Sequence, residues 1–267
     1  VSIETFPDKI ALALLSQNPI LYFDRYKELC PDLTVDWLQR VYQFYHADRE
    51  NKKQDYTPIS LAKLVSYLSC MPGEKVVYDC CCGSGALTIQ KWCVNPDLKF
   101  VCEELDERVI PILLFNLCIR NIEATVVNKD ILTGDIINSY TVIRGSVYGT
   151  VQRSMFPETE LLKADVGVSN PPFNLRVPVS GIITNDLPSQ YTCNFAFVAH
   201  CLQRSERCAL ILPRGVLTSK EEKECRRYFV EKGWLQAAIS LPEKMFESTS
   251  VATCILLFDK RKTSKDV

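Results

Sequence analysis

Apolar residues recur with two different periods along this chain of 267 residues. Up to about residue 50 they have the three- and four-residue spacing of amphipathic helices, most clearly in LALLSQNPILYF and VDWLQRVYQFYHA. From residue 75 onward, short apolar runs typical of buried strands alternate with helix-like segments. The pattern predicts a short N-terminal helical segment, residues 1–50, followed by an α/β domain over residues 51–267.

Seven apolar runs in the second part are expected to be strands. They are KVVYD, FVCEE, ATVVN, DVGVSN, RCALILP, LQAAIS and CILLFD. Because helix-like segments separate most of them, we expect βαβ units in a doubly wound, seven-stranded, mostly parallel sheet. Ligands of such sheets bind at the carboxyl ends of the strands, near the point where the strand order reverses. Residues 133–164 have no clear period, and we expect an irregular insertion there.

Composition and charge narrow the class of protein. The apolar share of 47% and the charged share of 24% are typical of a soluble globular protein. No apolar run of eighteen residues and no signal-peptide pattern occurs, so we expect a cytoplasmic protein without a membrane partner. A net charge of −1 predicts that any contact with nucleic acid uses a local patch or a basic partner.

The thirteen cysteines do not have the spacing of a metal site. Cys80, Cys81 and Cys82 are adjacent, the others are scattered through apolar segments, and there is no C-x-x-C pair. We therefore expect no bound metal, and reduced thiols that pack as small apolar side chains.

The stretch DCCCGSG, which follows the first predicted strand, is the first candidate for chemistry. Gly83 and Gly85 lie between a strand and a helix, where a backbone without side chains can approach a ligand closely. Glu104 ends the next strand, where an acid can bind both hydroxyls of a ribose. The missing third glycine favours an adenosyl group with a charged sulfonium, attracted by Asp79, over a pyrophosphate. The alternative is a tight strand-to-helix turn without a ligand.

Two further stretches contain prolines at expected element boundaries. Tyr56-Thr57-Pro58 precedes the helical sequence SLAKLVSYL, and could simply begin that helix with Thr57 as its cap and Pro58 at the first helical position. Asn170-Pro171-Pro172-Phe173 follows an apolar strand. Two consecutive prolines make a stiff loop, so Asn170 and Phe173 are presented in a fixed geometry.

Along the chain the order is Tyr56-Thr57-Pro58, then Asp79-x-x-Cys82-Gly83-Ser84-Gly85, then Asn170-Pro171-Pro172-Phe173. In that order the three motifs resemble those of the amino-methylating DNA methyltransferases, most closely the modification (methylation) subunits of type I restriction-modification systems. Phe197-x-x-His200 followed by ALILPRGVL, and LPEKMF followed by TSVATCILLF, are similar to stretches of the same family. The resemblance covers residues 54–260 and implies a class I S-adenosylmethionine-dependent methyltransferase fold, which is Rossmann-like. It departs from the family at Cys80, where a proline is usual.

The resemblance also implies roles for individual residues. The side expected to bind S-adenosylmethionine comprises Tyr56, Thr57 and Pro58 at the methionine part, Asp79, Cys82, Gly83, Ser84 and Gly85 as the main cradle, Glu104 at the ribose, Asp130 at the adenine, and Asn170. The catalytic loop comprises Asn170, Pro171, Pro172 and Phe173. Here the Asn170 side chain and the Pro171 carbonyl would accept hydrogen bonds from the target amine, and Phe173 would stack on the target base.

The resemblance implies a site-specific, adenine-specific DNA methyltransferase that acts on the N6 amine of a flipped-out adenine in a restriction-modification system. Two alternatives stay open: methylation of another planar amine, in a protein glutamine or an RNA base, and a non-catalytic relative that binds cofactor. No target-recognition domain is evident, so residues 133–164, a missing domain or a separate specificity subunit would recognise the DNA sequence. The candidate phosphate contacts are Arg144, Arg153, Arg176, Arg226 and Arg227, for which a solvated surface position is the alternative.

Overall fold

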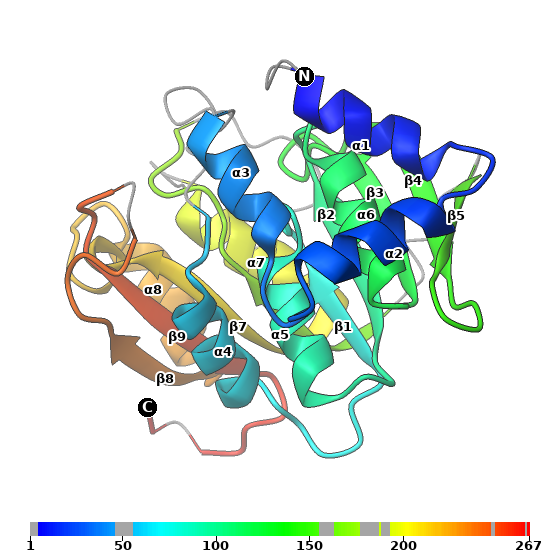
Figure 1. Cartoon of the computed structure of the whole chain (residues 1–267). Helices are drawn as coiled ribbons and strands as arrows, with labels where there is room; N and C mark the ends of the chain where they lie inside the picture. The colour runs from blue at the N-terminus through cyan, green and yellow to red at the C-terminus, as the bar shows by residue number, and fades with distance from the viewer. Residues whose placement is uncertain are drawn as a thin grey trace.

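The apolar runs of the second part form one central sheet in the computed structural model, which describes residues 5–45, 56–154, 163–176, 187, 193–246, 249–264 and 266–267. The strands are β1 (Val76–Asp79), β2 (Lys99–Glu104), β3 (Ala124–Lys129), β4 (Ile136–Ile143), β5 (Thr150–Ser154), β6 (Ala164–Ser169), β7 (Ser205–Pro213), β8 (Leu235–Ser240) and β9 (Thr253–Asp259). They pair in the order β5-β4-β3-β2-β1-β6-β7-β9-β8, and Figure 1 shows the sheet with β4 and β5 at one side and β8 and β9 at the other.

The centre of the sheet is parallel and its two edges are antiparallel. Strands β3, β2, β1, β6 and β7 run in one direction, β9 runs against β7 and β8, and β4 and β5 form an antiparallel hairpin beside β3. The order reverses at β1, because β2 and β3 extend from one side of it and β6 and β7 from the other. The predicted α/β fold with a mostly parallel, doubly wound sheet is confirmed.

The prediction of seven strands and an irregular insertion at residues 133–164 is wrong, because β4 and β5 lie in that stretch and the sheet has nine strands in the described residues. Most side chains of this hairpin are exposed or half-buried, so it lacks the continuous apolar run that marks a buried strand. Its order comes from pairing with β3 and from the Gly149 amide, which donates to the carbonyl of Cys118 over 2.8 Å.

Helices cover both faces of the sheet (Figure 1). They are α1 (Phe6–Leu14), α2 (Ile20–Leu29), α3 (Trp37–Tyr45), α4 (Ile59–Leu68), α5 (Ala86–Val94), α6 (Ile110–Ile119), α7 (Asn194–Arg204) and α8 (Lys223–Glu231), with a short 3₁₀ helix η3 (Arg214–Leu217). One core packs α4, α5 and α6 on the sheet, and a second core packs α7 and α8 on the opposite face. Alternation along β1 divides these cores, since Val77 belongs to the first and Tyr78 to the second.

The N-terminal helices complete the first core. Phe23 of α2 and the α3 side chains Leu38 and Tyr42 are buried in it. Arg120, itself buried, donates to the carbonyls of Leu33 and Val35 and so attaches the segment between α2 and α3 to the end of α6. The predicted domain division at residue 50 lies outside the described residues and stays a prediction.

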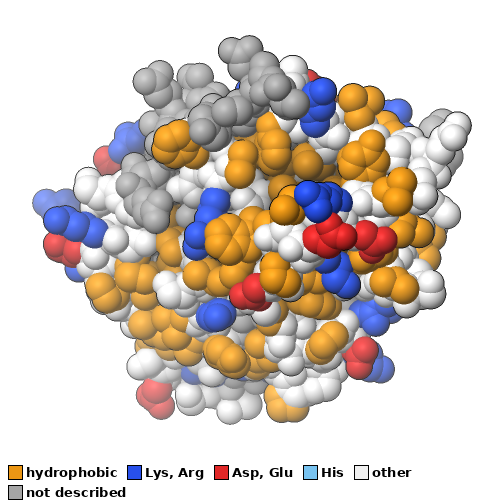
Figure 2. Space-filling model, in the orientation of Figure 1, with side chains coloured by type: hydrophobic (Ala, Val, Ile, Leu, Met, Phe, Trp, Pro, Cys, Tyr) orange, Lys and Arg blue, Asp and Glu red, His pale blue; other side chains and the backbone are white. Residues whose placement is uncertain are grey.

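The outer surface of the same helices remains apolar. Leu12, Leu15, Ile20, Leu21 and Leu29 are each more than half exposed. In Figure 2, apolar side chains are spread over this face of the molecule between the charged groups. None of the described helices is long and apolar enough to span a membrane.

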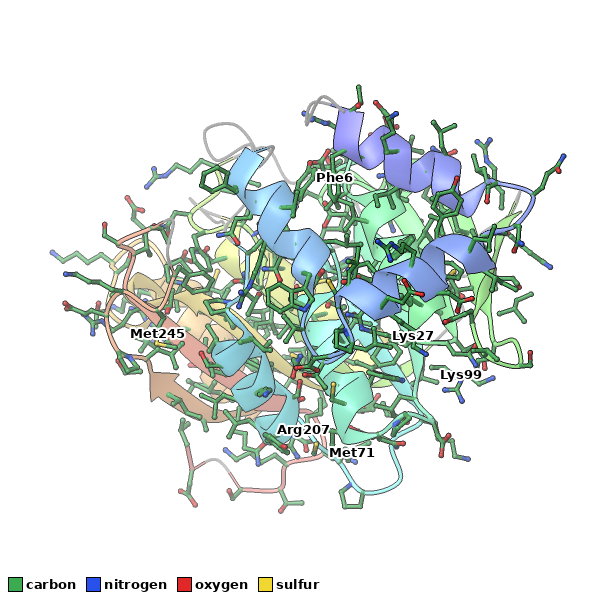
Figure 3. All side chains as sticks on the ribbon, viewed as in Figure 1. Phe6, Lys27, Met71, Lys99, Arg207 and Met245 are labelled. Atoms are coloured by element: carbon green, nitrogen blue, oxygen red, sulfur yellow. The ribbon has the colours of Figure 1, made fainter. Side chains whose placement is uncertain are left out.

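The strand directions decide where a site can form. Figure 3 places Met71, Lys99 and Arg207 along one edge of the molecule, and Lys99 begins β2 while Arg207 lies near the start of β7. The carboxyl ends of the parallel strands therefore lie at the opposite edge. Each of the predicted strand-end motifs, after β1, β2, β3 and β6, is at that edge.

Candidate functional site

The turn between β1 and α5 contains two glycines with positive φ angles. Gly83 has φ +54° and Gly85 has φ +99°, a region that side chains disfavour. A Cβ atom on Gly85 would lie 3.0 Å from Cδ1 of Leu113, and one on Gly83 would lie 3.3 Å from the ring of Tyr56. The turn is therefore held in its conformation by packing as well as by backbone geometry.

The end of β2 is hydrogen-bonded to this turn. The Gly83 amide donates to Oε2 of Glu104 over 2.8 Å, and the Asp106 amide donates to Oε1 of the same carboxylate over 2.8 Å. The Cys82 amide donates to the carbonyl of Glu103. Glu104 is only half-buried, so this preorganised carboxylate borders solvent.

Asp79 is the most unusual titratable group of the site. It is fully buried, and Thr88 donates to its Oδ2 over 3.3 Å, whereas its Oδ1 has no hydrogen-bond partner among the described residues. Burial raises the pKa of Asp79 to about 8, although the Cys81 amide and the Thr88 hydroxyl favour the ionised form. A buried carboxyl group with an open oxygen is suited to a cationic partner.

Tyr56 lies against the same turn, and Thr57 does not cap the helix that follows. Tyr56 and Thr57 are buried, and the Tyr56 ring contacts the position above Gly83. Pro58 has ψ +144° and precedes α4 as its N-cap residue, without a side-chain capping bond. The capping interpretation, with Pro58 as the first helical residue, is wrong because an extended ψ cannot belong to a helix.

Tyr42, which no sequence motif singled out, also borders this region. Its ring packs edge-on against Tyr56, with the centroids 6.0 Å apart, and its hydroxyl donates to Oδ2 of Asp106 over 2.9 Å. Helix α3 thus supports Asp106, whose amide donates to Glu104. An aromatic residue in an amphipathic helix is usually read as core, and only the fold shows where it lies.

The remaining predicted cofactor residues also lie at this edge. Asp130 follows β3, and its Oδ1 accepts a hydrogen bond from the Leu132 amide over 2.9 Å. Ser84 is buried, and its carbonyl accepts from the Asn116 side chain over 2.9 Å. Cys82 is buried in the first core. These residues are positioned by their own local contacts.

The stiff proline loop continues from β6. Asn170 is half-buried, Pro171 is buried, Pro172 is half-buried and Phe173 is 6% exposed. The Phe173 ring packs edge-on against Phe246, with centroids 5.4 Å apart. The amide of the next residue, Asn174, donates to Oδ1 of Asn194 at the start of α7 over 3.1 Å, which fixes the end of the loop.

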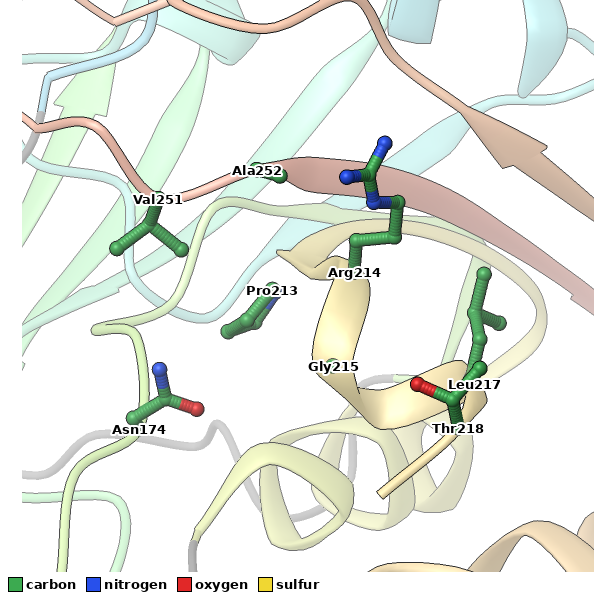
Figure 4. A pocket seen from close by; sticks show the side chains of 8 residues that line it. All are labelled: Asn174, Pro213, Arg214, Gly215, Leu217, Thr218, Val251 and Ala252. Atoms are coloured by element: carbon green, nitrogen blue, oxygen red, sulfur yellow. The ribbon is translucent and has the colours of Figure 1, made fainter.

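A cavity of about 480 Å³ lies beside this loop. It is lined by Asn174, Pro213, Arg214, Gly215, Leu217, Thr218, Val251 and Ala252, as Figure 4 shows. The Arg214 amide donates to the Ala252 carbonyl over 2.7 Å, so η3 and the chain before β9 form one wall. The stretches ALILPRGVL and TSVATCILLF were the sequence signals for most of these residues.

The five predicted phosphate contacts are not gathered at the site. Arg144 and Arg153 lie on or beside the β4–β5 hairpin and bind the Pro96 carbonyl and Asn138. Arg226 and Arg227 lie on α8. Arg226 donates to the Val216 carbonyl, and Arg227 pairs with Glu224 and Glu231.

Arg176, which follows the proline loop, pairs with Glu221 over 3.0 Å. Among the described residues there is no group of three or more His, Cys, Asp or Glu side chains that could hold a metal. All thirteen cysteines are free, and only Cys93 is exposed.

The matches of this chain to known proteins cover both the glycine turn and the proline loop. The family model described as N-6 DNA Methylase matches residues 34–267. The chain is 26% identical, over 92% of its length, to the type I restriction enzyme MjaVIII methylase subunit of Methanocaldococcus jannaschii, and covers 44% of that protein. It is 26% identical, over 79% of its length, to the type I restriction enzyme MpnII methylase subunit of Mycoplasma pneumoniae, and covers 41% of it. The chain thus spans less than half the length of these curated relatives.

Solved structures share the fold. The type I restriction-modification methyltransferase subunit of Streptococcus thermophilus superposes with a TM-score of 0.65 at 22% identity, over 86% of this chain and 50% of that one. A Listeria monocytogenes protein assigned to the class I S-adenosylmethionine-dependent methyltransferases gives 0.62 at 16% identity, over 99% and 72%. At such identities the likeness concerns the arrangement of the backbone.

Proposed function

This chain belongs to the N-6 DNA methylase family, and from that premise we propose that it transfers a methyl group from S-adenosylmethionine to the N6 amine of adenine in DNA, within a restriction-modification system. One observation carries the proposal: the glycine turn and the proline loop leave neighbouring strands. Asp79 of β1 pairs in register with Val168 of β6, two residues before Asn170. The motif for a cofactor and the motif for an amine therefore meet at one point of the sheet.

The residues at the end of β1 and β2 fit the cofactor. The open Oδ1 of Asp79 offers a buried carboxyl oxygen to a cationic group, and the turn that follows presents backbone without side chains at Gly83 and Gly85. Glu104 is oriented by two backbone amides and retains acceptor capacity for ribose hydroxyls. When bound, S-adenosylmethionine supplies an electrophilic methyl group on its sulfonium sulfur.

The proline loop supplies the other half of the chemistry. The lone pair of an exocyclic amine is delocalised into the ring, which makes the nitrogen a poor nucleophile. The Asn170 side-chain oxygen and the Pro171 carbonyl would accept hydrogen bonds from the two N–H groups and localise that lone pair on nitrogen. Because two prolines fix the loop, the acceptors are preorganised, and orientation supplies much of the rate.

Phe173 is proposed as the platform for the extruded base. Its edge-on contact with Phe246 sets the orientation of the ring. Since only 6% of Phe173 is exposed, stacking requires the surrounding side chains to part when the base enters. The aromatic contact then compensates part of the unstacking from the duplex.

We infer that another subunit or domain recognises the DNA sequence. The relatives are named methylase subunits, and this chain with its net charge of −1 has no overall attraction to DNA. The β4–β5 hairpin is a poor candidate for this task. Strand β4 is four strand positions from β6, about 19 Å at the usual spacing. A cytoplasmic location is part of the same proposal.

Transfer of labelled methyl from S-adenosylmethionine to unmethylated mixed-sequence DNA tests this function. We expect label in adenine, and a loss of about a hundredfold or more in Asn170→Ala with an unchanged melting temperature. Asn138→Ala, on the edge hairpin, is the matched control and should retain the activity. Full activity in Asn170→Ala would contradict the proposal, and label in RNA or protein glutamine but not DNA would redirect it.

If the isolated chain binds cofactor but methylates no DNA, the assay is repeated with a candidate specificity subunit added. Activity that appears only in the complex would locate sequence recognition outside this chain. Continued inactivity of a complex that binds both cofactor and DNA would favour a non-catalytic relative.

A further inference from the structure

A buried polar network lies on the α7 face of the sheet, outside the site described above. Tyr78 of β1, Glu103 of β2 and His200 of α7 are each at most 4% exposed. The Tyr78 hydroxyl lies 2.5 Å from Oε2 of Glu103 and 2.6 Å from Nε2 of His200, and those two atoms are 3.0 Å apart. The three side chains thus join two strands to one helix.

The charges and protons of this network can be assigned. Burial alone would raise the pKa of Glu103, but the hydrogen bond and charge of His200, with Lys129 and Arg204 at 3.8 Å, lower it to about 2. Glu103 is therefore an acceptor, and the single hydroxyl hydrogen of Tyr78 is donated to it. The Tyr78 oxygen can then only accept from His200, so Nε2 of His200 carries a hydrogen.

Each strand residue of the network directly precedes one of the acids of the proposed cofactor site. Tyr78 precedes Asp79, Glu103 precedes Glu104, and Lys129 precedes Asp130. Because successive strand side chains point to opposite faces, the network lies behind the ends of β1 and β2, while Asp79 and Glu104 lie on the other face and Asp130 follows the end of β3.

The backbone of Glu103 transmits this anchoring to the glycine turn. Its side chain is held by Tyr78 and His200, and its carbonyl accepts the Cys82 amide over 3.1 Å. The carboxylate of the next residue, Glu104, accepts the Gly83 amide. A displacement of Glu103 would therefore move the acceptors of two consecutive amides of the turn.

Helix α7 also holds the proline loop at its other end. Asn194, six residues before His200, accepts from the Asn174 amide and donates from Nδ2 to the Asn174 side chain and to Glu222. At a rise of about 1.5 Å per residue, the two anchor points are about 9 Å apart on one rigid element.

We propose that α7 aligns the two halves of the site, with His200 and Glu103 as positioning residues for the glycine turn and Asn194 as the positioning residue for the proline loop. The functional part of this inference rests on the proposed methyl transfer. In-line attack tolerates little error in geometry, and a misplacement of about 1 Å can lower a rate about a hundredfold. One helix that contacts both halves limits such errors.

Stability alone does not account for the network. Replacement of a buried ionic cluster by packed apolar side chains is often neutral or stabilising, so the burial of these groups is weak evidence of a stabilising role. A merely structural network would also affect the whole fold when altered, instead of the two segments that α7 contacts. This difference makes the proposal testable.

The first experiment measures backbone amide exchange in the full chain without ligand. In His200→Ala we expect the Cys82 and Gly83 amides to exchange about tenfold faster or more, relative to amides of the β7–β9 pairing. Val198→Ala, a fully buried position of α7 in the second core, is the matched control and should change both groups of amides alike. His200→Gln, whose amide can donate from a similar position, should restore part of the protection.

The second experiment titrates S-adenosylmethionine into the same variants by calorimetry. We expect His200→Ala to bind about tenfold more weakly or worse, Val198→Ala to bind as wild type, and Tyr78→Phe, which removes one hydroxyl, to lie between. Asn194→Ala should keep the cofactor affinity and show a lower kcat for transfer, whereas His200→Ala should raise the KM for cofactor.

The outcomes separate this inference from the proposed function. If the wild type fails to bind the cofactor but the selective exchange effect is present, the proposed function fails and the positioning role of α7 stands. If the wild type binds and His200→Ala matches Val198→Ala in exchange and affinity, the positioning role is overturned and the function stands.

Discussion

The two halves of the site are built in different ways. The half at β1, β2 and β3 takes its polar groups from one continuous stretch, residues 79–130, and many of its contacts are between backbone amides and nearby carboxylates. The half around Asn170 is assembled from separate segments, because Asn194, Phe246 and the residues of η3 surround the proline loop.

The two halves therefore differ in the kind of substitution that disrupts them. The turn at Gly83 and Gly85 and the carboxylate of Glu104 depend on local geometry. The addition or removal of a single atom there therefore changes this half of the site directly. The proline loop is locally stiff, but its surroundings depend on contacts between segments more than forty residues apart, such as Phe173 with Phe246. A substitution in one of these segments therefore affects the proline loop through the packing of side chains.

The largest effect within the first half is expected at Asp79. Asp79→Asn keeps the size of the side chain but removes the charge that would face the cationic cofactor. We expect S-adenosylmethionine to bind about ten- to a hundredfold more weakly at pH 9, as measured by calorimetry. At pH 6 the difference should shrink, because the pKa of about 8 leaves Asp79 protonated in the free protein. An equal loss at both pH values would contradict this assignment.

The same pKa has a consequence for stability. In the unfolded chain Asp79 loses its proton near its ordinary pKa of 3.8, whereas in the folded protein it keeps the proton up to about pH 8. The folded state thus binds more protons in this window, and the unfolding free energy of the wild type should fall as the pH rises from about 4 to about 8. Chemical denaturation of Asp79→Asn should lack this part of the decline.

Gly85 tests the local geometry with a somewhat smaller expected effect. Gly85→Ala adds a Cβ atom 3.0 Å from Leu113 at φ +99°, whereas Gly134→Ala has a similar φ of +89° with nothing within 4 Å. Both changes strain the backbone, but only the first adds a clash. We expect Gly85→Ala to lower the unfolding free energy by about 1–2 kcal/mol more than Gly134→Ala. Equal losses of unfolding free energy in the two variants would show that the Leu113 side chain moves aside without cost.

Arg214 tests the second half, with the smallest expected effect. Its partly exposed side chain lines the cavity beside the proline loop and is 3.8 Å from Glu243. We expect Arg214→Gln to weaken DNA binding a few-fold and to reduce the salt dependence by about one phosphate contact, with cofactor affinity unchanged. Arg227→Gln, on α8 between two glutamates, is the control in the same binding titration. Equal behaviour of the two variants would exclude Arg214 from the DNA contact.

Most of the fold followed from the sequence where burial was strong. The central strands have continuous apolar runs because both of their faces are covered, and such runs are easily read. The edge hairpin of β4 and β5 was missed because its side chains are mostly exposed and its order depends on pairing with β3. The prediction of Thr57 as the helix cap is wrong because α4 begins one residue later, at Ile59, with Pro58 as its N-cap residue.

The residue types at the strand ends can be read from the sequence: Gly83 and Gly85 in the turn, and Pro171 and Pro172 in the stiff loop. These features depend on backbone dihedral angles, which are local. What lies behind and beside them depends on the packing of distant segments: Tyr42 at the turn, His200 behind Glu103, and Asn194 at the loop. These contacts join residues 20 to 97 positions apart, and no local pattern encodes which distant side chain packing will bring to a given place.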